Sequence, residues 1–295
     1  MYRIIQKRKI FLSISGILCL AAILFLIIWP LRLGIDFQGG TMLELSWDKP
    51  TSPQEIEERL AHLDLGEIKV QETGNNSYIL KLREIDEKTH QEVLKSLGNP
   101  QEQKYEIIGP TIGREVKSKA KTAVILAVIL VFFYVAWAFR KLSRIFHQQE
   151  SWRYGAGAII ALFHDMLIMC GFFALLGHFR GVEVNTLFVT ALLTTLGYSI
   201  NDTIVIFDRI RENTLIYGRA NFEEVVNRSL NESLIRSFNT SLTTLLVLFA
   251  IALFAGAAIR TFALAMIIGV ISGTWSSIAV ATPFILLGKK SEQKT

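Results

Sequence analysis

Six long stretches without charged side chains constrain this 295-residue chain more than any other feature. They hold 18 to 28 residues each and are interrupted only by His164, Asp165 and Asp202. A helix needs about 20 apolar residues to cross the hydrocarbon core of a bilayer. We therefore predict a polytopic α-helical membrane protein with six transmembrane helices, at about 10–31, 119–139, 154–177, 184–207, 237–259 and 261–288.

The composition agrees with this prediction and excludes several other classes. Hydrophobic residues make up 51% of the chain and charged residues 19%, against about 25% charged in a typical soluble domain. The 2 cysteines, Cys19 and Cys170, both lie in apolar stretches, so we expect neither a disulfide scaffold nor a cysteine-based metal site. The sequence has no P-loop motif. We expect no cofactor, no metal and no enzymatic activity.

Basic residues gather in alternate short loops, which predicts the orientation in the membrane. Residues 1–9 carry four of them, and the loops that precede spans three and five and the tail at 289–295 carry others. The short loops of the other side hold only Arg180 and Arg260. Both termini are therefore expected in the cytoplasm and the segment 32–118 outside. The net charge of +5 follows from this topology, so we expect no nucleic-acid partner.

The segment 32–118 reads as a small α+β domain of ferredoxin-like βαββαβ order. Alternating apolar residues predict strands at 42–47, 68–72, 78–82 and 105–108, and helical spacing predicts helices at 51–63 and 87–97. His62 and His90 are interpreted as solvated residues on polar helix faces. The pattern favours a domain that makes contacts rather than one that carries out catalysis.

Asp202, near the end of span four, is the clearest candidate for a functional group within the membrane, where ionisable residues are costly. It is either a hydrogen-bonded tie between helices or a titrating carboxylate that loads and releases a proton. Arg236 at the start of span five is either the partner cation or a residue that extends to the headgroups. Polar residues near these two predict a hydrated path between the spans: Tyr198, Ser199, Asn201, Thr203, Asn239, Thr240, Thr243 and Thr244.

The sequence shows three further patterns besides Asp202 and Arg236. His164 and Asp165 in span three form either a structural tie, the favoured interpretation, or a proton relay. Gly269, Gly273 and Ser277 in span six form a small-residue packing face. The segment 208–236 predicts an amphipathic helix at the cytoplasmic membrane surface or at a partner.

Four segments together resemble the SecF family, subunits of the bacterial SecDF complex that assists the Sec translocase. They are the motif around Gly34, Asp36, Phe37, Gly39 and Gly40, the Phe163–Asp165 triplet, and the segments 197–213 and 236–245. SecF is in turn similar to one half of an RND-type exporter. The resemblance covers nearly the whole chain in order.

The resemblance implies a multi-pass protein of the bacterial cytoplasmic membrane that works with SecD beside the SecYEG channel. It implies that the proton-motive force drives preprotein translocation and release, with Asp202 as the proton-handling carboxylate, Arg236 as a functional arginine and Asp165 in a recurrent motif. Membrane lipid and unfolded preproteins are then the other partners. An RND-type small-molecule exporter and a non-transporting scaffold stay open as alternatives, as does Na⁺ in place of H⁺.

Overall fold

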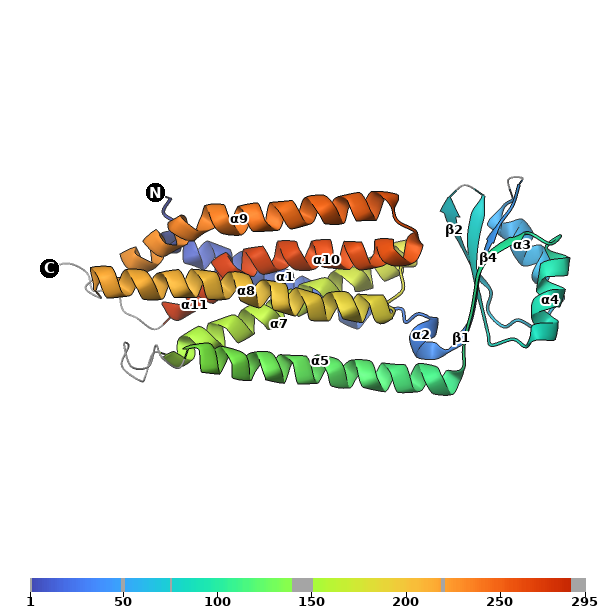
Figure 1. Ribbon diagram of the computed structural model, residues 1–295, viewed down its shortest axis with the longest axis horizontal. Coiled ribbons are helices and arrows are strands. Elements are labelled where there is room, and N and C mark those ends of the chain that lie inside the picture. Colours follow the sequence, from blue (N-terminus) through green and yellow to red (C-terminus); the bar gives the residue numbers. More distant parts are fainter. Residues whose placement is uncertain (1, 49–50, 75, 140–150, 219–220, 288–295) are drawn as a thin grey trace. The chain divides into compact units, whose positions relative to one another are not determined.

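The computed structural model describes residues 2–48, 51–74, 76–139, 151–218 and 221–287 (Figure 1). The chain divides into two compact units, which are described separately here. The helical unit comprises residues 1–32, 124–182 and 187–295, and the insert unit comprises residues 33–123 and 183–186. The predicted tail at 289–295 and the loop residues 140–150 lie outside the described residues.

The insert unit is built on a four-stranded antiparallel sheet with the strand order β2-β3-β1-β4. This is the ferredoxin-like arrangement that the βαββαβ order predicted. Its elements are α2 (Ile35–Gln38), β1 (Gly40–Ser46), α3 (Pro53–Leu60), β2 (Lys69–Gly74), β3 (Ser77–Leu82), α4 (Glu87–Ser96) and β4 (Gln101–Ile108).

Local sequence signals explain both longer helices of the insert unit. The Ser52 hydroxyl accepts a hydrogen bond from the Glu55 N–H, and Pro53 takes the first helical position of α3. The Asp86 carboxylate caps α4 in the same way, at the Thr89 N–H. Both helices bury one apolar face against the sheet, and the shared core is made of Leu43, Leu45, Ile56, Leu60, Leu65, Tyr78, Leu80, Leu82, Ile85, Val93 and Leu97.

His90 corrects the sequence interpretation, because its side chain is buried rather than solvated. The residue is 4% exposed, its ring stacks on Tyr105 at 3.9 Å, and its Nε2 lies 2.7 Å from Glu102. The register of β4 against β1 shifts between Glu44 and Leu45, so this irregularity pairs Glu102 with the core residue Leu45. Such a bulge redirects side chains and leaves little trace in a hydrophobic pattern. His62 is exposed, as predicted.

Most residues of the long helices belong to the helical unit, although residues 110–123 and Thr186, at the starts of two of them, belong to the insert unit. Six helices in the described part of the chain are long and apolar enough to cross a membrane, as the charge gaps predicted. Their elements are η1 (Ile5–Lys7) with α1 (Arg8–Ile28), α5 (Pro110–Phe139), α7 (Ser151–Arg180), α8 (Thr186–Tyr217), α9 (Phe222–Phe254), and α10 (Ala257–Ser276) followed by the π-helical turn η2 (Ser277–Ala281) and α11 (Thr282–Ile285).

The segment 208–236 is not a separate surface helix. Residues up to Tyr217 continue α8, and residues from Phe222 onward belong to α9, which runs unbroken to Phe254. The predicted apolar face exists, since Phe222, Val226 and Leu230 are buried in the main core of the unit. The chain buries this face against its own helices because the two long helices continue side by side past the apolar spans (Figure 1).

Small residues set the packing of α10 against α8. A Cβ atom at Gly269 would lie 2.4 Å from the Thr195 side chain, and one at Gly273 would lie 3.0 Å from the Ser199 Cβ. The absence of side chains at these two positions therefore lets the helices approach closely. The predicted packing face of span six is confirmed, and it brings the serines of α10 beside the polar residues of α8.

Pro283 accounts for the irregular end of the last span. Proline lacks the N–H group that an α-helix needs and crowds the preceding turn. The preceding residues widen into the π-helical turn η2, in which the Thr282 hydroxyl donates to the Ser277 carbonyl at 2.7 Å. This turn starts at Ser277, one of the residues that face the buried carboxylates described below.

Candidate functional site

Asp165 on α7 lies at the centre of a hydrogen-bonded cluster that satisfies both of its carboxylate oxygens. Its carboxylate is 1% exposed and accepts from the hydroxyls of Ser199 on α8 at 2.5 Å and of Ser272 and Ser276 on α10 at 2.7 and 2.8 Å. The Nδ1 atom of His164 lies 3.0 Å from the same carboxylate. Four polar neighbours from three helices satisfy this buried charge, which is the arrangement that a buried carboxylate requires.

Asp202 on α8 has a much poorer environment. The residue is 9% exposed, and its Oδ1 accepts a hydrogen bond from the Ser237 hydroxyl on α9 at 2.5 Å. Its Oδ2 is buried and makes no hydrogen bond of normal geometry within the described residues, although the Ser277 hydroxyl is close. Asp202 lies 16 residues after the start of α8, about 24 Å along the helix axis. It is thus a buried carboxylate with one oxygen that could accept a further hydrogen bond.

The other predicted polar residues of α8 divide between several partners. Ser199 binds Asp165 rather than Asp202, and Thr203 pairs with Ser277 at 2.9 Å. The Tyr198 hydroxyl donates to Ser241 at 3.2 Å, and Ser241 in turn lies 2.5 Å from the Thr274 hydroxyl. Asn201 is exposed on the surface of this chain. These contacts tie α8 to α9 and α10 beside both carboxylates.

The predicted polar residues of α9 do not face α8 in the isolated chain. Asn239, Thr240 and Thr243 are exposed, and the threonine hydroxyls at 240, 243 and 244 donate to carbonyls of their own helix. A different face of the helix, spaced at i, i+4 and i+8, is the buried one: Ser233, Ser237 and Ser241. The hydroxyls of Ser237 and Ser241 meet α8 and α10, whereas that of Ser233 donates to the Ser229 carbonyl of its own helix.

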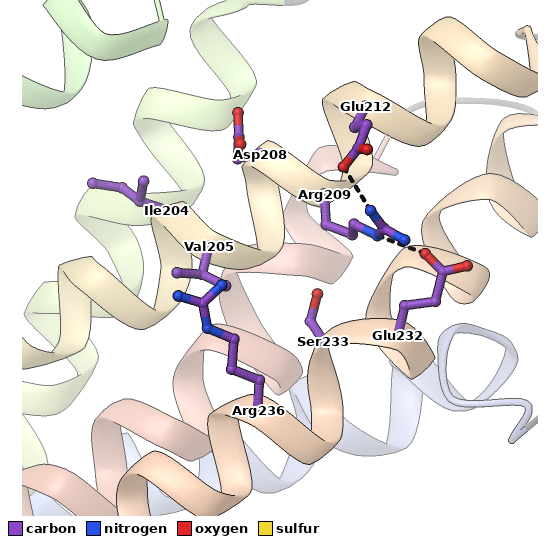
Figure 2. Close-up of a pocket in the computed structure, with 8 residues that line it drawn as sticks. All are labelled: Ile204, Val205, Asp208, Arg209, Glu212, Glu232, Ser233 and Arg236. Carbon is purple, nitrogen blue, oxygen red and sulfur yellow. Dashed lines mark hydrogen bonds and ion pairs between the residues drawn. The ribbon is translucent and has the colours of Figure 1, made fainter.

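Arg236 lines a cleft of about 480 Å³ between α8 and α9. The lining also includes Ser233 and the charged residues Asp208, Arg209, Glu212 and Glu232. Arg209 joins Glu212 and Glu232 at 2.6 and 2.7 Å, whereas the Arg236 side chain extends toward Val205 (Figure 2). Arg236 forms no ion pair with any described residue, and it lies one position before Ser237, the hydroxyl donor of Asp202.

The predicted Gly-Gly motif forms a compact turn in the insert unit. Gly39 and Gly40 have φ values of 82° and 132°, which side chains rarely adopt, and a Cβ at Gly39 would lie 2.8 Å from Pro110. Phe37 is buried. Asp36 accepts hydrogen bonds from the N–H and hydroxyl of Thr186, the first residue of α8, at 2.8 and 2.5 Å. Gly34 donates its N–H to the Val184 carbonyl at 2.8 Å.

The described residues contain no group of three His, Cys, Asp or Glu side chains that could hold a metal ion. Sequence reasoning identified both buried carboxylates but missed Ser237, Ser241, Ser272 and Ser276. The available signal was their spacing, since Ser272 and Ser276, and Ser237 and Ser241, are each four residues apart and so share one helix face. Serine is frequent in such helices for packing reasons, which is why the spacing alone did not single them out.

Family models and similar proteins all indicate the same family for this chain. The family described as "Protein export membrane protein SecD/SecF, C-terminal" matches residues 89–291, and the "SecD/SecF GG Motif" matches residues 25–51. Protein translocase subunit SecF of Thermobaculum terrenum is 41% identical over 294 residues, covering 94% of this chain and 91% of that protein. SecF of Anaerolinea thermophila is 37% identical over 300 residues, covering 99% of this chain and 96% of that protein.

Two solved structures of SecDF resemble the fold. The crystal structure of SecDF from Thermus thermophilus, a translocon-associated membrane protein, matches with a TM-score of 0.84 and 30% identity. SecDF in its super-membrane-facing form matches with a TM-score of 0.68 and the same identity. Each match covers 97% of this chain and 38% of the SecDF chain, so this chain spans well under half of SecDF. Together with the family matches, this shows that the chain is a multi-pass membrane protein that belongs to the SecF family of protein translocase subunits.

Proposed function

We propose that this chain works with SecD as an accessory subunit of the Sec translocase and uses the proton-motive force to assist preprotein translocation and release. In this proposal the chain lies in the bacterial cytoplasmic membrane with both termini in the cytoplasm and the insert unit outside. SecYEG, unfolded preproteins and membrane lipid are its further partners. The relatives named SecF and the likeness to SecDF support the assembly.

The observation that carries the proposal is the unequal environment of the two buried carboxylates. Asp165 has four hydrogen-bonding neighbours, whereas Asp202 has one hydroxyl donor and a buried Oδ2. A carboxylate that lacks donors is stabilised by taking up a proton, because the neutral form loses less solvation on burial. Asp202 is therefore the residue that we expect to gain and lose a proton during each cycle of translocation.

Ionised Asp202 needs a further donor, and this requirement links the proton to movement. Arg236 adjoins Ser237 in sequence and forms no ion pair within the described part of the chain. Movement of α9 against α8 that brings Arg236 toward the carboxylate would stabilise the ionised state, and protonation would release it. One charge crossing the membrane supplies about 2.3 kcal/mol per 100 mV, enough to bias two arrangements of a helix bundle.

The exposed polar groups of α8 and α9 support a protein partner at this site. Arg236, Asn239, Thr240 and Thr243 on α9 and Asn201 on α8 are exposed in the isolated chain. Polar side chains are costly against lipid tails and usually face other helices in a membrane. Gly197, one turn before Asn201, has open space around it and would allow a neighbouring helix to approach closely. We propose that SecD covers this face.

The direct test is pulse-chase export of a precursor that bears a signal peptide, in cells whose only copy of this chain carries Asp202→Asn. We expect slow export with a normal membrane level and normal co-purification of SecD. Asp202→Glu, which keeps an ionisable group, should restore export at least in part. Dissipating the proton-motive force should slow export in wild-type cells and have little further effect in Asp202→Asn cells, beyond what it does in cells without SecD.

Asp165→Asn is the matched control, because it removes the other buried charge from the same helical unit. We expect it to lower the membrane level or the SecD association rather than to uncouple an assembled complex. Normal export with Asp202→Asn would exclude the proton role of Asp202 and favour a scaffold. A loss of assembly with Asp202→Asn that equals that of Asp165→Asn would assign both residues to structure.

A further inference from the structure

The loop that precedes α8 is held by the Gly-Gly motif, although about 150 residues separate them in sequence. The Gly34 N–H donates to the Val184 carbonyl, and Leu33 forms a parallel bridge with Val184. A Cβ atom at Gly34 would lie 3.4 Å from the Val184 carbonyl oxygen, an ordinary van der Waals distance, so the two segments are in direct contact. These residues, together with Thr186, belong to the insert unit.

Asp36 acts on the first turn of α8 as a cap supplied from elsewhere in the chain. Its Oδ2 accepts from the backbone N–H of Thr186 at 2.8 Å and from the Thr186 hydroxyl at 2.5 Å. The first N–H groups of a helix lack partners within the helix, and the helix dipole favours a negative charge there. Asp36 thus satisfies a need that a local capping residue more often meets.

A second contact reinforces the first on the neighbouring strand. Lys81 of β3 forms an ion pair with Glu183 at 2.7 Å, and the two side chains are only 18% and 12% exposed. Residues 183–186 are therefore bound by the side chains of Asp36 and Lys81 and by a backbone hydrogen bond from Gly34. The loop is thus held to the insert unit by side-chain and backbone contacts at Glu183, Val184 and Thr186.

From these contacts we propose that Asp36 is a positioning residue that joins the first turn of α8 to the insert unit, so that displacement of the helix bearing Asp202 is transmitted to that unit. The inference rests on the function proposed above. α8 runs without a break from Thr186 through Asp202 to Tyr217, so a shift at the carboxylate reaches Thr186 along about 24 Å of continuous helix. At Thr186, Asp36 converts that shift into displacement of the insert.

A purely structural cap would also stabilise α8, so loss of stability does not separate the two roles. The difference lies in how Asp36 depends on Asp202. If Asp36 is a joint between α8 and the insert unit, it transmits the effect of changing Asp202 to the position of the insert. If Asp36 is only a cap, it stabilises α8 equally in either state of Asp202. The test therefore measures the position of the insert unit in both states of Asp202, with and without Asp36.

The experiment uses the full chain assembled with SecD in lipid nanodiscs, with Cys19→Ser and Cys170→Ser so that spin labels attach only where intended. Labels at Glu58→Cys on α3 and Leu253→Cys on α9 lie on exposed positions of the two units. Double electron–electron resonance gives the distance distribution between them. We expect Asp202→Asn to shift that distribution when Asp36 is present. We expect a clearly smaller shift in Asp36→Ala, in which the Lys81 and Gly34 contacts remain.

Two variants keep the test decisive if Asp36→Ala assembles poorly. Thr186→Val removes the hydroxyl donor but keeps the backbone N–H, so it should reduce the shift without abolishing it. Asp64→Ala removes the Asp64–Arg83 ion pair elsewhere in the insert unit and should leave the full shift. An undiminished shift in Asp36→Ala, or in Thr186→Val if that is the variant that assembles, would overturn the joint while leaving the proposed function intact. No shift from Asp202→Asn in the otherwise unaltered chain would overturn both.

Discussion

Asp165 and Asp202 are two carboxylates buried in the same helical unit, on neighbouring helices, yet they have different numbers of hydrogen-bond donors around them. Asp165 is surrounded by three serine hydroxyls and His164, and its two oxygens are both satisfied. Asp202 accepts from the Ser237 hydroxyl on one oxygen, and its other oxygen is buried without a hydrogen bond of normal geometry in the described residues. Burial alone therefore does not distinguish the environments of the two carboxylates. The number of donors that surround each carboxylate does.

The difference follows from where the serines lie on α10 and α9. Ser272 and Ser276 are one turn apart and converge on Asp165 because Gly269 and Gly273 let α10 approach α8 closely. α9 offers only Ser237 to Asp202, with Arg236 on the adjacent face. Close packing supplies several donors to the first carboxylate, whereas α9 supplies one to the second.

The largest expected effect comes from removing Asp165. Asp165→Ala leaves four buried polar groups without their acceptor, and breaking such a cluster costs about 3–5 kcal/mol. Asp202→Ala orphans one hydroxyl, so we expect a loss of about 1–2 kcal/mol. Denaturant unfolding of the purified protein in detergent, followed by the membrane level in cells, measures both. Equal losses of stability would remove the distinction between the two sites.

The next largest effect tests whether close packing creates the Asp165 cluster. Gly269→Ala places a methyl group 2.4 Å from Thr195, which α10 can relieve only by moving away from α8. Overpacking of this kind costs about 1–3 kcal/mol. Gly197→Ala is the matched control, since a Cβ there meets nothing within 4 Å in this chain. We expect it to leave the unfolding free energy of the isolated chain unchanged, and a loss equal to that of Gly269→Ala would argue against the packing explanation.

The sequence supports some of these conclusions and not others. Charge gaps identify six spans because an ionisable group in lipid is costly, and for the same reason Asp165 and Asp202 stand out. The insert order follows from alternation and turn residues. The partner hydroxyls do not follow, because α9 carries polar residues on two faces and only packing decides which is buried. Ser237 and Arg236 differ by one residue, about 100° of helix rotation.

His90 shows a second limit, which concerns strands rather than helices. A regular β4 would alternate through Glu102 without interruption, and the irregularity that pairs Glu102 with Leu45 has no signature in the residue types. The Asp36–Thr186 contact is a third case. Its two residues are 150 positions apart, and no local pattern relates them.

A smaller effect compares one hydroxyl from each site. Ser276→Ala leaves Asp165 with its other neighbours, so we expect a loss of about 1 kcal/mol in unfolding free energy and normal force-dependent export. Ser237→Ala removes the single well-formed donor of Asp202, so export should become less dependent on the proton-motive force while stability changes little. Translocation of a precursor into inverted membrane vesicles, with and without a proton gradient, measures the difference. The opposite pattern would exchange the roles assigned to the two carboxylates.

The smallest effect concerns a hydroxyl–carboxylate hydrogen bond that is exposed to water, and it shows how much burial matters at Asp165 and Asp202. Asp86 accepts from the Thr89 N–H and hydroxyl at 3.0 and 2.6 Å but is solvent-exposed, and the hydroxyl bond, followed by the backbone bond, holds the pKa of Asp86 below its ordinary value. A depressed pKa means that this stabilisation is fully present above the unfolded-state value of about 3.9 and is lost as the pH falls through the folded-state pKa. Hydrogen exchange of the α4 amides should therefore speed up as the pH is lowered below about 3.9, after correction for intrinsic rates. Thr89→Val should abolish most of that step, whereas an unchanged step would mean that hydroxyl donors matter to carboxylates in this chain only where water is excluded.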